Sequence, residues 1–119
     1  MNRRDVLRGA VALSVSAPAA IGFVAYDPLL SKIREYQRGL DEFNRLAGDL
    51  DNDECSALAD RTYGPHLDHL SEWKEPATTF EGAMEALRIS LTDDGGVYGC
   101  EAAQRMVEAA LGYLETLRT

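Results

Sequence analysis

Apolar residues recur every three or four positions along four stretches of the chain, which is the spacing of amphipathic helices. These stretches are residues 29–50, 55–73, 80–91 and 100–117. None of the chain alternates apolar and polar residues for long enough to form a strand. Because the breaks between the stretches are short, we predict an all-α fold, an up-and-down bundle of about four antiparallel helices.

The apolar stripe on each helix is expected to form the core of this bundle. On the third helix the stripe is Phe80, Met84, Leu87 and Leu91. On the fourth helix it is Cys100, Ala103, Val107, Ala110, Leu114 and Leu117. Gly82 and Ala86 on the third helix are small, so they leave room for a neighbouring helix to approach closely.

Polar residues mark where the helices begin. The predicted caps are Asp27 before Pro28, one of Asp51, Asn52 and Asp53, and Thr78 in a capping box with Glu81. Within the second stretch, Pro65 follows Gly64 and removes a backbone hydrogen-bond donor. We therefore expect a kink or a short interruption near Thr62.

The first 26 residues have a different character from the rest of the chain. Three arginines precede Gly9–Ala25, a segment without any charge, and this order is typical of an export signal. The segment around Arg3, Arg4, Val6 and Leu7 resembles a twin-arginine signal, with Asn2 where Ser or Thr is usual and Val6 where Phe is usual. We predict that residues 1–26 are an apolar signal helix read by the twin-arginine (Tat) translocase, and that residues 27–119 are a separate helical domain.

The sequence leaves open whether residues 1–26, which we call the leader, are cleaved off. The small residues of Ala17-Pro18-Ala19 suit a signal peptidase, and cleavage there would release a periplasmic or secreted domain. If the leader is not cleaved, residues 9–25 are just long enough to anchor the protein in the inner membrane. The remaining alternative is a frayed N-terminal helix on a cytoplasmic protein.

Length and charge narrow the classes of function. A chain of 119 residues holds one small domain beside the leader. Residues 27–119 contain nine Lys and Arg and nineteen Asp and Glu, a net charge of −10. This sign opposes binding to nucleic acid or to anionic lipid, and it favours a basic protein partner.

The candidate ligands for a metal are few. His66 and His69 are three residues apart and share one helical face, with Asp68 and Glu72 nearby. These are the two histidines of the chain, and His66 falls within the apolar stripe, where a packing role is more common. We predict no metal and no cofactor, with His66 and His69 as the candidates if a site exists.

Cys55 and Cys100 are the two cysteines and lie on predicted apolar stripes. In an exported domain they can form a disulfide, although the second and fourth helices of a regular bundle are diagonal; the alternative is two buried free thiols. The chain has no phosphate-binding glycine loop, CxxC pair or catalytic triad order, so we predict that it is not an enzyme.

Three short segments carry a further resemblance: residues 2–8, Asp27-Pro28, and Pro76–Gly82 followed by Ala86-Leu87. In these segments the chain resembles small bacterial helical proteins that have a twin-arginine-like signal before an acidic body. The resemblance implies no activity and no catalytic residues. We expect an exported, non-catalytic interaction or binding protein; the alternatives are a cytoplasmic helical accessory or assembly subunit and a small metal or redox protein.

Overall fold

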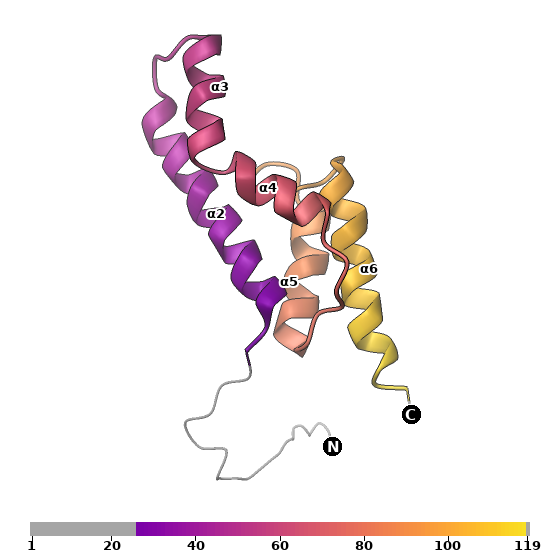
Figure 1. Cartoon of the computed structure of the whole chain (residues 1–119). Helices are drawn as coiled ribbons and strands as arrows, with labels where there is room; N and C mark the ends of the chain where they lie inside the picture. The colour runs from indigo at the N-terminus through magenta and orange to yellow at the C-terminus, as the bar shows by residue number, and fades with distance from the viewer. Residues whose placement is uncertain (1–25, 119) are drawn as a thin grey trace.

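The computed structural model describes residues 26–118, and every regular element within that range is an α-helix (Figure 1). The helices are α2 (Pro28–Ala47), α3 (Asn52–Arg61), α4 (Gly64–Ser71), α5 (Phe80–Leu91) and α6 (Glu101–Glu115). The all-helical prediction is confirmed for this part of the chain. The predicted signal helix, including Arg3, Arg4, Val6 and Leu7, lies outside the described residues.

Local capping explains where the first helices begin. Asp27 is the N-cap of α2, and its carboxylate accepts hydrogen bonds from the backbone N–H groups of Leu29 and Leu30. Asp51 caps α3 in a capping box with Glu54, in which each side chain accepts from the other residue's backbone N–H. The predicted start at Asp27 is confirmed, and of the three candidate caps for the second helix the structure selects Asp51.

The start of α5 differs from the predicted capping box of Thr78 and Glu81. The N-cap is Thr79, whose hydroxyl oxygen accepts from the backbone N–H of Gly82 at 2.9 Å. Thr78 is turned away, because its own hydroxyl donates to the carbonyl of Tyr26 at 3.1 Å. A contact between distant parts of the chain therefore moves the cap by one residue.

The predicted second helix is two helices. α3 ends at Thr62, whose hydroxyl donates to the carbonyl of Leu58 at 2.8 Å, and α4 begins at Gly64-Pro65. The interruption expected near Thr62 is confirmed, since Pro65 has no N–H for a continuing helix. It changes the direction of the chain, so that α4 lies obliquely across its neighbours (Figure 1).

Four of the five helices form the body of the domain. α2 contacts α4 and α5, and α6 contacts the same two helices. The first and last helices are consequently diagonal, whereas in a regular up-and-down bundle they would be neighbours. The extended segment after α4 causes this order: it passes over α6, where the N–H of Ala77 donates to the carbonyl of Ala109 at 3.0 Å, and it delivers α5 beside α2.

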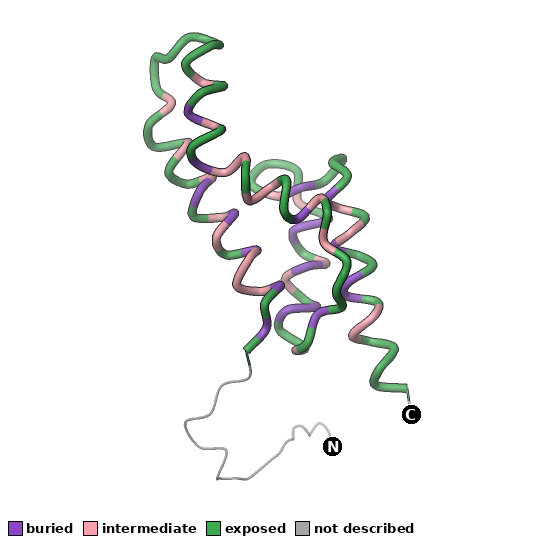
Figure 2. Tube along the Cα trace, viewed as in Figure 1, coloured by how far each residue is buried: buried purple, intermediate pink, exposed green. Residues whose placement is uncertain are grey.

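The outer half of α2 and all of α3 project from this body as a hairpin (Figure 1). The described structure measures 54 Å in its longest dimension and 27 and 19 Å in the others. Figure 2 shows that the hairpin is largely exposed, with Leu58 as the buried residue of α3. Leu46 and Leu50, near its tip, are exposed as well.

The core lies where α2, α4, α5 and α6 meet. Its largest fully buried side chains are Leu29, Ile33, Leu70, Val97 and Met106. The stripe predicted for the first helix is confirmed for its inner half, where Leu29, Ile33 and Tyr36 are buried. The remaining core positions on α5 and α6 are mostly alanines. Several larger apolar residues of these two helices are therefore exposed on the surface.

Candidate interaction surface

The stripe predicted to be the core side of α5 is on its outer side. Phe80, Met84 and Leu91 are 59%, 39% and 74% exposed, and Leu87 is half-buried. The buried residues of α5 are instead Gly82, Ala83, Ala86, Ile89 and Ser90. The prediction of this core stripe is therefore wrong, because the small residues let α2 and α6 approach closely and the bulky stripe is turned away.

α6 repeats this arrangement. Of the six residues in its predicted stripe, Ala110 is the one that is buried. The side that packs on α4 and α5 consists of Ala102, Met106, Ala109 and Ala110. Val107, Leu111 and Leu114 are exposed. On both helices a second stripe, built mainly from small residues with Ile89 on α5 and Met106 on α6, forms the core.

The exposed stripes of the two helices form one surface. α5 and α6 are antiparallel and side by side, with α2 and α4 packed on one side of the pair (Figure 1). Because the packed sides point toward α2 and α4, both exposed stripes lie on the opposite side. We call this surface the α5–α6 face; it consists of Phe80, Met84, Leu87, Leu91, Val107, Leu111 and Leu114.

The α5–α6 face has the size of the largest apolar patch that a typical monomer exposes. With about 150–250 Å² for a whole aromatic side chain, it presents on the order of 500 Å² of apolar surface. The largest apolar patch on a typical monomer is about 300–600 Å² and is often functional. This face therefore needs an explanation, whereas a single exposed leucine would not.

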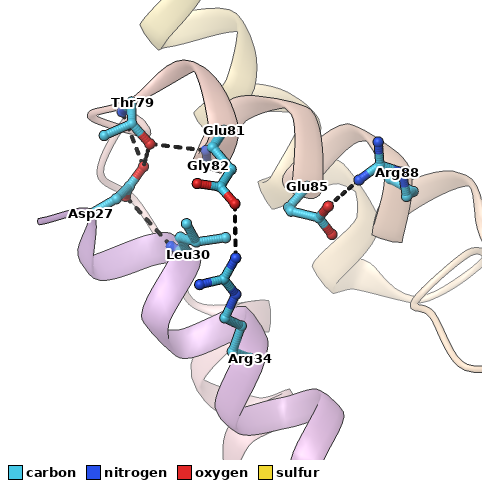
Figure 3. A network of polar contacts seen from close by, with 8 residues as sticks. All are labelled: Asp27, Leu30, Arg34, Thr79, Glu81, Gly82, Glu85 and Arg88. Carbon is cyan, nitrogen blue, oxygen red and sulfur yellow. Dashed lines mark hydrogen bonds and ion pairs between the residues drawn. The ribbon is translucent and has the colours of Figure 1, made fainter. Parts of the chain in front are cut away.

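Charged side chains border the face. On α5 these are Glu81 and Arg88, whose side chains are 65% and 58% exposed. Glu81 accepts a hydrogen bond from Arg34 of α2 at 2.8 Å, and Arg88 pairs with Glu85 one turn earlier on α5 (Figure 3). The border thus carries both signs of charge around an apolar centre, as protein interfaces do.

A buried carboxylate positions α5 and its face. Asp27, 4% exposed, caps α2 through one oxygen, while its Oδ2 accepts from three donors at the start of α5. These are the N–H of Thr78 at 3.2 Å, and the N–H and hydroxyl of Thr79 at 3.0 and 2.8 Å. Figure 3 shows Asp27 and Thr79 pointing toward each other across the two helix ends. One side chain therefore joins two helix N-termini that are 52 residues apart.

Gly82 makes this junction possible. A Cβ atom built on Gly82 would lie 1.9 Å from Oδ2 of Asp27, closer than any real contact. No residue with a side chain fits without displacing the carboxylate. The predicted close approach at Gly82 is found, although the group that approaches it is the side chain of Asp27, the N-cap of α2, rather than the body of a neighbouring helix.

The described residues also line hollows around α4 and the segment that follows it. A cleft of about 990 Å³ is lined by residues of α4, the segment after it and α6, among them His69, Trp73, Glu101 and Arg105. Its walls mix carboxylates with basic groups. A smaller, mainly apolar cavity of about 300 Å³ lies between Pro28, Trp73 and Pro76.

The two histidines do not meet. Nδ1 of His66 lies 3.6 Å from Oε1 of Glu35 on α2, while the exposed His69 packs its ring 5.7 Å from that of Trp73. Within residues 26–118 no three His, Cys, Asp or Glu side chains come close enough to hold a metal ion. The structure thus gives His66 and His69 separate partners.

The cysteines are free thiols in this structure and neither is buried. Cys55 is half-buried on α3, with its Sγ 3.8 Å from the carbonyl of Leu50, and Cys100 is exposed at the start of α6. Among the described elements α3 contacts α2 and α4 but not α6. The expectation that both thiols face the core is wrong, because the interruption at Thr62 places Cys55 on the projecting hairpin and Cys100 is the N-cap before α6 rather than a residue of its buried side.

The surroundings of two neighbouring side chains on α2 shift their pKa values from the ordinary range. Burial raises the pKa of the Tyr36 phenol, whose hydroxyl donates to the carbonyl of Gly96 at 3.1 Å. The hydrogen bond from Lys32, at 2.8 Å, lowers the pKa of Glu35, and the nearby His66 lowers it further. Both groups join α2 to its neighbours and lie away from the α5–α6 face.

Comparison with known proteins adds no assignment: no family model matches the chain, and no curated protein or solved structure matches it significantly. No helix between residues 26 and 118 is long and apolar enough to cross a membrane.

Proposed function

We propose that this protein is an exported, non-catalytic interaction module that binds another protein molecule through the α5–α6 face. The observation that carries this proposal is the exposure of large apolar side chains on α5 and α6, whose buried sides consist mainly of small residues. Exposed apolar surface favours aggregation unless a partner covers it. Aliphatic, aromatic and thioether side chains bind by removal of water rather than by chemistry, which supports a binding role.

Export is proposed from residues 1–26, where paired arginines precede an uncharged apolar segment. Its test is fractionation of producing cells, comparing the parent chain with a variant in which Arg3 and Arg4 are both lysine. This change keeps the charge, so a general requirement for positive charge would leave the distribution unchanged. We expect the variant to remain in the cytoplasm; equal distributions would refute the twin-arginine route.

Binding through the face can be tested with a photo-crosslinking residue in producing cells. At Leu111, 53% exposed at the centre of the α6 stripe, we expect covalent adducts with a protein. The matched control is the same residue at Asp60, an exposed position on α3. Adducts in equal yield from both positions, or none from Leu111, would contradict the proposal.

A further inference from the structure

We infer that the partner at the α5–α6 face is a second copy of this chain, bound about a two-fold axis with the two α5 helices antiparallel. This inference depends on the proposed function and specifies its partner. It follows from the spacing of the apolar residues, the order of charges beside them and the area of the face.

The spacing on α5 is that of a helix contact. Phe80, Met84, Leu87 and Leu91 are separated by steps of four, three and four residues, as in helices that pack side by side over their whole length. The small residues facing the core follow a separate stripe. α5 therefore has two helix-packing sides: within the described structure the small-residue side is buried, whereas Phe80, Met84 and Leu91 on the other side are exposed and Leu87 is partly packed against the core.

The charges on α5 are self-complementary. Glu81 follows Phe80 and Arg88 follows Leu87, seven residues later, so both lie along the same border of the stripe. If a two-fold axis passes between Met84 and Leu87, antiparallel pairing places Glu81 within about one turn of the partner's Arg88. Symmetry repeats the contact, so two Glu81–Arg88 pairs form between the copies. They add to the pairs that Glu81 makes with Arg34 and Arg88 makes with Glu85 within each chain.

The area also suits a symmetric pair. A standard interface removes about 800 Å² from each partner. The apolar residues supply roughly 500 Å², and their charged borders extend the contact. A partner of the same shape covers the whole face, since each copy presents the same two antiparallel helices.

The net charge of −10 on residues 27–119 separates this partner from a basic one. Two acidic bodies repel each other at long range, and salt screens that repulsion. The dimer should therefore persist at high ionic strength. Attraction to a basic partner would weaken steeply under the same conditions.

The test is sedimentation equilibrium of the purified full chain over a range of concentrations, at 0.15 and about 0.5 M salt. We expect a dimer of twice the 13.1 kDa chain mass at both salt concentrations. Met84→Glu should raise the dissociation constant at least about 100-fold, because it buries a carboxylate in an apolar contact. Leu46→Glu is the matched control: Leu46 is 44% exposed, close to the 39% of Met84, but lies on the hairpin. Far-UV circular dichroism checks that both variants fold.

The pairing of Glu81 with the partner's Arg88 can be tested separately by reversing the charges. Arg88→Glu should weaken the dimer by about 3- to 30-fold, and adding Glu81→Arg to it should restore the affinity, because the reversed charges again complement each other. A chain that stays monomeric at all concentrations, or one whose dimer responds to Leu46→Glu and not to Met84→Glu, would overturn the inference. If the chain is monomeric but Leu111 crosslinks to a different protein, the proposed function stands and this partner is wrong.

Discussion

Replacing Asp27 by Asn tests the junction that joins α2 to α5. Asn has nearly the same volume as Asp and caps a helix equally well, so the N-cap of α2 is retained. Its side chain has one acceptor oxygen instead of two, because an NH2 group, which can only donate, replaces the second oxygen. Whichever way the amide turns, donors of Leu29 or of Thr78 and Thr79 lose their acceptor in a site where Asp27 is 4% exposed.

The expected loss follows from those contacts. A hydrogen bond to a charged group contributes about 1.5–3 kcal/mol, and a buried donor without a partner costs about 1–3 kcal/mol. Oδ2 of Asp27 accepts three such bonds, from the N–H of Thr78 and from the N–H and hydroxyl of Thr79. Because the donors relax together and water enters in part, the sum is smaller than the separate values. We expect Asp27→Asn to lower the free energy of unfolding by about 2–4 kcal/mol.

Urea unfolding at pH 7, followed by far-UV circular dichroism, measures this change. The matched control is Asp51→Asn at the exposed N-cap of α3, where the same substitution should cost less than about 0.5 kcal/mol. The m-value should stay constant in both variants, which makes the midpoints comparable. Equal midpoints for the two variants would refute the role assigned to Asp27.

Three further outcomes follow from the structure. Gly82→Ala should destabilise the domain by about 2 kcal/mol or more, measured by the same urea unfolding, because the new methyl group overlaps the carboxylate of Asp27; an unchanged midpoint would contradict this. The raised pKa of Tyr36 means that its stabilisation is complete below pH 10 and is lost as pH rises through the higher folded-state value; the unfolding midpoint should fall in that window, and Tyr36→Phe should remove the fall. The lowered pKa of Glu35 means that its contribution is present above pH 4.5 and is lost as pH falls through the lower folded-state value; from pH 6 to pH 2 the midpoint should fall less in Glu35→Gln than in the parent chain.

The candidate surface shows how far periodicity can predict. Met84 and Val107 were expected in the core because large apolar residues at helical spacing usually face inward. Ala83 and Ala109 follow the same spacing on the neighbouring sides of α5 and α6 and are the residues that are buried. Alanine at regular intervals signals close helix packing, but it does not reveal whether a bulkier stripe beside it is also covered within one chain.

The two histidines and the two cysteines also show what sequence spacing can and cannot predict. Sequence spacing brought His66 and His69 together as candidate metal ligands and placed Cys55 and Cys100 on predicted apolar stripes. The break at Thr62 separates the cysteines, because it leaves Cys55 on the projecting hairpin while Cys100 lies at the start of α6. Both histidines stay on α4, where His66 lies beside Glu35 of α2 and His69 packs against Trp73. A local signal predicted that break, but the direction of the chain after it depends on contacts of α4 with α2 and α6.

What the sequence alone determined about the described chain is local. The helical class and the starts at Asp27 and Asp51 depend on side chains within a few residues of the backbone groups that they cap, so they can be predicted without a fold. The tertiary structure alone decided which apolar stripe of α5 and α6 is buried and which residue caps α5. Both choices follow from contacts between distant segments: Asp27 reaches Thr79 across 52 positions, and close packing of small residues turns the large ones outward.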